Sequence, residues 1–225
     1  MLKLIVGNRN YSSWSLRAGL YLRESGLDYE EIRVPLFTGN WRDELLKYSP
    51  AGRVPVLLDG GNAVWDSLAI FETLAERGGI GWPTDPVQRS RARSLACEMH
   101  AGFMALRDEL PLNLRARTSL PLDTLSSACR AQIDRIEAIL EQELGRSGGP
   151  WLFGPLSIAD IMYAPVVLRF ATYGLSTGPA SEQFLRQVQS LSSFQQWLEL
   201  ARAEPETLEF IDQRLPAEQS PLTLG

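Results

Sequence analysis

Two short segments of the chain carry residue types and a spacing that suit the binding of a small extended peptide. Arg53, Val54 and Pro55 open an apolar run, and Asp66 and Ser67 follow one short strand later. Because a proline fits only at the start or free edge of a strand, Pro55 marks an exposed edge. If the Val54-Pro55 bond is cis, the turn leaves the N–H and C=O of Val54 unpaired and able to hold a ligand. The alternatives are an ordinary trans proline and, at Asp66-Ser67, a plain helix N-cap.

A cluster of hydroxyl groups near the start of the chain is the second candidate for chemistry. Tyr11, Ser12, Ser13 and Ser15 lie at the expected beginning of a helix, where they can donate hydrogen bonds or cap free amides. A nucleophilic serine needs a base beside it, and the chain has a single histidine, His100, far along the sequence. The cluster therefore favours a hydrogen-bond donor or a set of redundant helix caps over a serine hydrolase.

Composition excludes several classes of function. The chain has 225 residues, 44% of them apolar, and a net charge of -5, with no run of Lys and Arg interleaved with aromatic residues. We therefore expect no nucleic-acid partner. No apolar run approaches the roughly 20 residues of a membrane span, and no signal peptide is recognisable, so we expect a cytoplasmic protein without a membrane partner. Cys97 and Cys129 lack metal-ligand spacing and are expected to be buried reduced thiols, and no metal site is expected.

The first third of the chain alternates strand and helix patterns. Short apolar runs predict strands, and apolar residues at helical spacing predict helices between them. The expected strands are 2–6, 29–34, 54–58 and 63–65, and the expected helices are 12–24, 41–47 and 67–77. This order predicts a small helix-covered sheet with a parallel first pair and a hairpin turn at 59–62.

The remainder of the chain is expected to be helical. Residues 78–86 are rich in Gly and Pro and predict a linker, and no convincing strand follows them. The periodicity predicts helices over 86–110, 123–144, 157–170 and 192–203. Ser157 and Asp160 match a capping box at the start of the third of these, for which we expect a structural role. The predicted division is residues 1–77, a linker at 78–86, and residues 87–225.

In this organisation the chain resembles a soluble glutathione S-transferase over nearly its whole length. The resemblance is carried by Tyr11–Ser15, Ser49–Pro55, Asp66–Ile70 and Leu156–Ile161, whose order and spacing together are specific. The hydroxyl-rich segment is similar to that of serine-type members, and of the zeta class in particular. The resemblance implies an α/β plus all-α fold class: a thioredoxin-like N-terminal domain followed by an all-helical C-terminal bundle.

The resemblance also implies that glutathione is the cosubstrate and that its cysteinyl backbone lies along Val54. Asp66 and Ser67 suit the other end of the peptide, because the first amides of a helix attract a carboxylate and Asp66 can pair with an ammonium. The residue that meets the glycyl carboxylate is left open between Arg53, Asn40 and Trp41.

Ser12 is the residue that the resemblance places at the ligand's thiol, with Ser13 second and Tyr11 a remote candidate. Lowering a thiol pKa from about 8.5 to about 6.5 requires roughly 2.7 kcal/mol of preferential thiolate binding. A hydrogen bond to a charged group supplies about 1.5 to 3 kcal/mol, and a helix N-terminus adds about 0.3 to 1 kcal/mol. One hydroxyl therefore nearly suffices, and Ser12 is expected to remain protonated.

The expected activity is glutathione transfer to a small, apolar electrophile, as in detoxification. Apolar and basic residues of the helical half are candidates for the acceptor site or for core: Met99, Phe103, Met104, Arg107, Arg169 and Tyr173. Zeta-type isomerisation of a maleylacetoacetate-like substrate is the enzymatic rival. Two departures weaken it, because Thr172 stands where that class has an arginine, one turn after Arg169, and Trp14 replaces the cysteine of the class motif.

A non-catalytic glutathione-binding module is the rival from another class of function. The resemblance further implies a homodimer, in which the first domain of one subunit meets the second domain of its partner. The identity of the electrophile is not encoded in any motif, because apolar pockets discriminate weakly: one methylene changes preference by about 1 to 3 kcal/mol.

Overall fold

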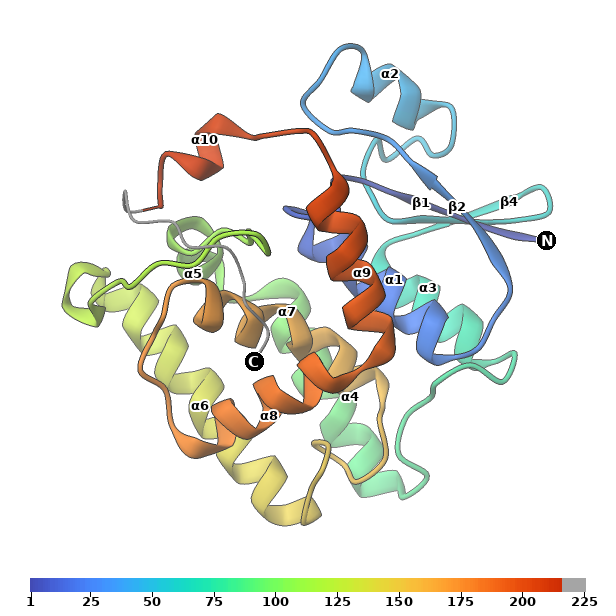
Figure 1. Ribbon diagram of the computed structural model, residues 1–225. Coiled ribbons are helices and arrows are strands. Elements are labelled where there is room, and N and C mark those ends of the chain that lie inside the picture. The colour runs from blue at the N-terminus through green and yellow to red at the C-terminus, as the bar shows by residue number, and fades with distance from the viewer. Residues whose placement is uncertain (216–225) are drawn as a thin grey trace. The chain divides into compact units, whose positions relative to one another are not determined.

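The computed structural model describes residues 1–215, which form two compact units (Figure 1). The first unit contains residues 1–81 and also residues 192–206, so that a late segment of the chain completes the early one. The second unit contains residues 82–191 and the segment that begins at Thr207. Within the described residues, none of the helices has both the length and the apolar character needed to cross a membrane.

The first unit is built on a four-stranded sheet. Its strands are β1 (Leu2–Val6), β2 (Tyr29–Arg33), β3 (Val56–Asp59) and β4 (Asn62–Trp65), in the order β2-β1-β3-β4. The β1–β2 pair is parallel and the other two pairs are antiparallel, which confirms the parallel first pair and the hairpin. Gly60 adopts a positive φ of 59° in that hairpin turn, a conformation that glycine accepts without steric cost.

Four helices belong to this sheet unit: α1 (Ser13–Glu24), α2 (Trp41–Leu46), α3 (Ser67–Ala75) and α9 (Ser192–Ala203). Helix α9 packs on α1 (Figure 1), and the contact depends on Gly19, where a Cβ would lie 2.0 Å from the ring of Trp197. Trp197 also donates its indole N–H to the carbonyl of Arg9 over 3.1 Å. The buried ring of Trp197 therefore packs directly against Gly19 and holds α9 on α1.

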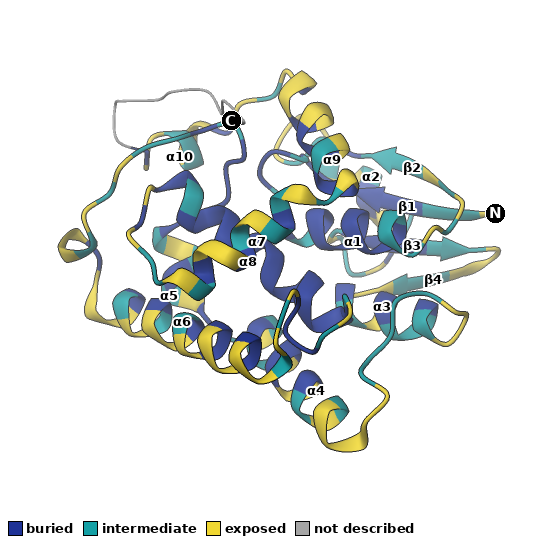
Figure 2. Cartoon of the chain, turned by 60° about the horizontal axis from the view of Figure 1, so that its bottom comes forward, coloured by how far each residue is buried: buried dark blue, intermediate teal, exposed yellow. Residues whose placement is uncertain are grey.

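The second unit is helical. Its elements are α4 (Pro86–Ala101), α5 (Met104–Glu109), the 3₁₀ turn η1 (Leu122–Thr124), α6 (Ser127–Ser147), α7 (Ile158–Thr172), α8 (Pro179–Ser190) and α10 (Glu209–Asp212). Helix α7 is buried along nearly its whole length (Figure 2) and packs against α4 and α8. The predicted capping box is present at its start, where the Ser157 amide donates to the Asp160 carboxylate over 2.9 Å. The predicted fold class, a thioredoxin-like sheet unit with helices and a helical remainder, is confirmed.

Several boundaries differ from the sequence-based expectation. The helix predicted over 86–110 is wrong as a single helix, because Gly102 is extended and Phe103 has a positive φ of 62°, which separates α4 from α5. The helix expected from residue 123 begins instead at Ser127, after the 3₁₀ turn, with Ser126 as its cap. Helix α8 was not predicted, although a proline at its first position is a usual helix start. Cys97 is exposed rather than buried, whereas Cys129 is buried as expected.

Candidate active site

Strand register brings the predicted site segments to the same end of the sheet. Ile5 pairs with Val56 and Val56 pairs with Trp65, both in antiparallel ladders. Continuing these registers past the ladders sets Gly7 and Ser67 beside Val54. The packing agrees, since a Cβ at Gly7 would lie 3.2 Å from Val54 Cγ2.

Val54 lies just outside β3 and keeps its main-chain groups out of the ladder. The Val54-Pro55 peptide bond is cis. No backbone hydrogen bond to the N–H or C=O of Val54 is formed by residues 1–215, and the residue is half-buried. An extended ligand could therefore pair with this residue as a strand pairs with a sheet edge. Arg53, next to it, is exposed and makes no ion pair or hydrogen bond with the described residues.

Asp66 and Ser67 start helix α3 as predicted. Asp66 is the N-cap, with a positive φ of 52°, and its carboxylate accepts the amide of Leu68 over 3.1 Å. The hydroxyl of Ser67 is different, because its side chain is buried to 1% exposure and its Oγ has no hydrogen-bond partner among the described residues. A buried hydroxyl without a partner is costly, so an acceptor that reaches it gains a bond. Together with the free amides of the helix start, Ser67 suits a carboxylate ligand.

Ser12 is the N-cap of α1, and its hydroxyl is half-buried. Its Oγ accepts the amide of Ser15 over 3.1 Å, and its hydroxyl donates to Ser15 Oγ over 2.9 Å. Ser15 is completely buried and accepts the amide of Gly7 over 2.9 Å. The capping interpretation is therefore confirmed, and the role of Ser12 as a donor to a ligand stays a prediction.

The other members of the hydroxyl cluster are less accessible. Tyr11 and Ser13 are buried, and Trp14 lies with its ring 4.7 Å from the guanidinium carbon of Arg17. Arg17 is itself completely buried, so its charge is shielded by the indole face. Of the three serines at the beginning of α1, Ser12 is the most exposed.

The loop before Ser12 is held by two residues that sequence reasoning missed. The Asn8 carbonyl accepts the amides of Tyr11 and Ser12, and the Asn8 side chain accepts the amide of Leu36 over 2.8 Å. Glu204, which follows α9, accepts the amide of Arg9 over 2.8 Å. Asn8 could be found from its place two residues after the end of β1, whereas nothing local in the sequence connects Glu204 with this loop.

Glu204 belongs to an ion-pair network on the first unit. Arg9 contacts both Glu204 and Glu31, at 3.0 and 2.6 Å. Arg23 shares Glu31 at 3.0 Å, and Arg33 lies 3.7 Å from Glu204. Because these side chains are mostly buried, the network fixes β2, α1 and the end of α9 around the loop that leads to Ser12.

Two of the three residues left open for the glycyl carboxylate, Asn40 and Trp41, lie at the start of α2. Asn40 is exposed and donates to the Glu44 carboxylate over 3.3 Å, and it forms no side-chain cap. The Trp41 ring packs against Phe37 at 5.1 Å between ring centroids. Neither side chain presents a positive charge, so Arg53 is the cationic candidate of the three.

Most of the residues considered for an acceptor site belong to the core of the helical unit. Met99, Phe103 and Tyr173 are buried, whereas Met104 is exposed. Arg169 is buried, and its guanidinium donates to the carbonyls of Leu110 and Pro165.

The charge of Arg169 is strongly desolvated. Burial lowers the pKa of Arg169 to about 9, and the like charge of Arg107 acts in the same direction. Thr172 is also buried and donates to the Asn113 carbonyl over 2.9 Å. Neither position therefore presents a solvent-facing charge to a substrate.

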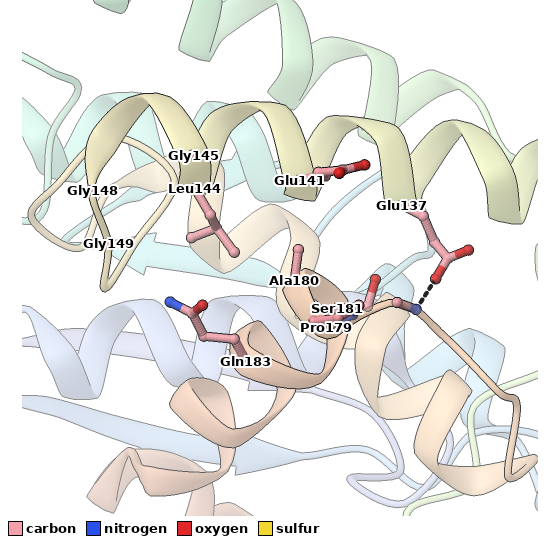
Figure 3. Close-up of a pocket in the computed structure, with 11 residues that line it drawn as sticks. Glu137, Glu141, Leu144, Gly145, Gly148, Gly149, Pro179, Ala180, Ser181 and Gln183 are labelled. Atoms are coloured by element: carbon pink, nitrogen blue, oxygen red, sulfur yellow. Dashed lines mark hydrogen bonds between the residues drawn. The ribbon is translucent and has the colours of Figure 1, made fainter.

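A cavity of about 580 Å³ lies within the helical unit, between α6 and α8. It contains none of the residues predicted for the site. Figure 3 shows the Glu137 carboxylate of α6 reaching the beginning of α8, where it accepts the amide of Gly178. Glu137 thus caps α8, which has no side-chain cap of its own, and its carboxylate in the lining has a structural role.

Comparison with known proteins agrees with the geometry of both units. Residues 11–77 match the family model for the N-terminal domain of glutathione S-transferase, and residues 98–200 match the model for its C-terminal domain. The first match contains Ser12, Val54 and Ser67, and the second contains the capping box of α7.

Named relatives and solved structures extend over most of the chain. Glutathione S-transferase 1 of Dianthus caryophyllus is 30% identical over 71% of this chain and 73% of its own. A probable maleylacetoacetate isomerase of Caenorhabditis elegans is 27% identical over 76% of this chain and 79% of its own. The structure of maleylacetoacetate isomerase from Methylobacterium extorquens AM1, with malonate and GSH bound, is 25% identical with a TM-score of 0.65, and the match covers 88% and 97% of the two chains. The chain therefore belongs to the glutathione S-transferase family and is an enzyme of that family.

Proposed function

We propose that this enzyme binds glutathione along Val54, anchors its γ-glutamyl end at Asp66 and Ser67, and stabilises its thiolate with the hydroxyl of Ser12. The observation that carries the proposal is the hydrogen-bonded link from Ser12 through Ser15 to Gly7, which packs against Val54. By strand register Ser67 lies at the same end of the sheet, and its hydroxyl has no hydrogen-bond partner among residues 1–215. The reaction is addition of the thiol to a small electrophile.

The chemistry of each part of glutathione matches the residues to which we assign it. The main chain of Val54 offers one donor and one acceptor, which suits the cysteinyl backbone of an extended tripeptide. The α-carboxylate of the γ-glutamyl group suits the Ser67 hydroxyl and the free amides of α3, and its ammonium suits the exposed carboxylate of Asp66. We assign Arg53 to the glycyl carboxylate because it is exposed and has no ion-pair partner among the described residues.

Ser12 acts as a donor and not as a nucleophile. A serine nucleophile needs an adjacent base, and His100, the only histidine, lies in helix α4 of the other unit. A donated hydrogen bond of about 1.5 to 3 kcal/mol and a helix N-terminus of about 0.3 to 1 kcal/mol together match the roughly 2.7 kcal/mol needed to lower the thiol pKa by two units.

Isomerisation of a maleylacetoacetate-like substrate is the second candidate, and the names of several relatives favour it. In that reaction glutathione adds to a double bond, allows rotation, and leaves. Against it, Arg169 and Thr172 are buried and bonded to main-chain carbonyls. We therefore place conjugation first.

Activity assays distinguish the two reactions. Retention on glutathione resin together with conjugation of a chlorinated dinitrobenzene supports the transferase, whereas conversion of maleylacetoacetate supports the isomerase. Retention without turnover across an electrophile panel would leave only a binding role.

The Ser12→Ala variant tests the mechanism. Loss of a hydrogen bond to the charged sulfur is expected to raise the pKa of the bound thiol by about 2 units and to lower turnover at neutral pH at least about tenfold. Ser13→Ala is the matched control, because Ser13 is the second candidate for the same role. An unchanged pH–rate profile in Ser12→Ala, or an equal change in Ser13→Ala, contradicts the assignment to Ser12.

Three further expectations stay predictions: the homodimer, the cytoplasmic location, and the domain division at residues 77 and 87. Sedimentation of the intact chain tests the first. We keep the expected dimer because it is the arrangement that the family resemblance implies.

A further inference from the structure

The hydrogen-bond partners of Ser15 define a role for this residue beyond helix capping. Its side chain is completely buried in the first unit. Among the described residues its hydroxyl has two partners, the Gly7 amide at 2.9 Å and the Ser12 hydroxyl at 2.9 Å. The Gly7 amide can only donate, so it occupies a lone pair of Ser15 Oγ. The proton of Ser15 therefore has one acceptor within reach, which is Ser12 Oγ.

Only one of the two hydroxyl protons can lie between the oxygens of Ser12 and Ser15. The structure pairs them with Ser12 donating, and rotation about the C–O bonds allows the reverse arrangement at the same separation. When an anion next to Ser12 takes the Ser12 proton as a hydrogen bond, the position between the two oxygens becomes available to the Ser15 proton. Ser12 Oγ then accepts from both the hydroxyl and the amide of Ser15 and donates to the anion.

We propose that Ser15 is a positioning residue for the thiolate: it turns its hydroxyl toward Ser12 Oγ when Ser12 donates to the glutathione sulfur. This inference rests on the proposed function of Ser12. Three donors, the Gly7 amide, the Ser15 hydroxyl and the Ser12 hydroxyl, then point one after another toward the negative charge. Each bond in such a chain polarises the next, which strengthens the final donor.

The same contacts connect the thiol site with the peptide site. Gly7 packs against Val54 and Leu36, where a Cβ would approach Leu36 Cδ1 to 2.6 Å. The backbone that donates to Ser15 is therefore held by the residue that is proposed to bind the cysteinyl backbone. A ligand that lies along Val54 therefore contacts the residue against which Gly7, the first donor of the chain, also packs.

The test compares the pKa of the glutathione thiol bound to wild type and to Ser15→Ala, followed by the ultraviolet absorbance of the thiolate. Ser15→Ala is expected to raise this pKa by about half a unit, because a neighbouring donor changes a hydrogen bond by roughly a tenth to a third of its strength. With a thiol pKa that rises from about 6.5 to about 7, turnover is expected to fall about 1.5-fold at pH 7 and about threefold well below the thiol pKa, and to return to the wild-type value well above it. A purely structural loss would lower turnover at every pH.

Ser25→Ala is the matched control, because Ser25 lies at the opposite end of α1 and its hydroxyl also accepts one backbone amide, that of Ile80. It should lower stability without moving the thiol pKa. If Ser15→Ala fails to fold, Ser15→Cys, which keeps a weak donor at the position, carries the test with a smaller rise in the pKa.

The outcomes separate this inference from the proposed function. A raised pKa in Ser12→Ala with an unchanged pKa in Ser15→Ala, or in Ser15→Cys if that variant carries the test, overturns the inference and leaves the role of Ser12 intact. An unchanged pKa in Ser12→Ala overturns both. A rise in both variants, with none in Ser25→Ala, supports the donor chain.

Discussion

Replacing Glu204 by alanine removes the carboxylate that ties the end of the α9 segment to the loop preceding Ser12. Glu204 accepts the amide of Arg9 over 2.8 Å and its guanidinium over 3.0 Å, and Arg33 lies 3.7 Å away. The Glu204 side chain is only 4% exposed. We therefore expect a large loss of stability from this single change.

The size of the loss follows from these contacts. Two hydrogen bonds to a charged group contribute about 1.5 to 3 kcal/mol each, and breaking a buried pair by removing one partner costs about 3 to 5 kcal/mol. Arg9 keeps its contact with Glu31 at 2.6 Å, which limits the damage. We expect the free energy of unfolding to fall by about 3 to 4 kcal/mol, near the lower end of that range.

Glu206→Ala is the control, because Glu206 also pairs with Arg33, at 2.9 Å, on a more exposed part of the network. Its loss is expected to cost about 1 kcal/mol. Urea unfolding followed by tryptophan fluorescence measures both variants, since Trp197 is buried against α1. If Glu204→Ala loses no more stability than Glu206→Ala, the proposed anchoring of the loop is refuted.

Two further changes test the glutathione site and the helical unit. Ser67→Ala should raise the KM for glutathione about fivefold to tenfold, while the free energy of unfolding changes little because the Ser67 hydroxyl has no hydrogen-bond partner within residues 1–215; a normal KM would exclude Ser67 from the site. Burial raises the pKa of Asp160 from 3.8 to about 6, so the folded state favours the neutral carboxyl group. The free energy of unfolding therefore falls as pH rises through about 6. Asp160→Asn should remove this loss, about 3 kcal/mol at most, and an unfolding free-energy difference from wild type that does not vary between pH 4 and pH 7 would contradict it.

The first unit could largely be read from the sequence because its signals are local. Short runs with strand-forming residues predicted all four strands, and the turn at residues 59–62 predicted the hairpin. The caps at Ser12 and Asp66 follow from residue types that satisfy free amides at helix starts. The candidate residues drawn from these motifs therefore lie at the helix starts that the motifs predicted.

Other features could not be predicted because they depend on contacts between distant residues. Glu204 reaches Arg9 only after α9 has packed on α1, and no local pattern encodes that pairing. The break between α4 and α5 requires a left-handed Phe103, a conformation that is uncommon for an aromatic residue. Helix α8 is the exception, because it begins at Pro179 and buries Phe184 and Val188 one turn apart, so a local signal was present.

Because residues 192–206 complete the first unit, this part of the enzyme cannot finish assembling in the order in which it is synthesised. In a nascent chain on the ribosome, the surface of α1 at Gly19 stays uncovered until Trp197 has been synthesised. Closing so long a loop adds little free energy, about 0.6 kcal/mol for each doubling of its length, but it delays the last contacts. The helical unit is thus synthesised while the sheet unit is incomplete, and in that interval the apolar surface that Trp197 later covers stays accessible to chaperones.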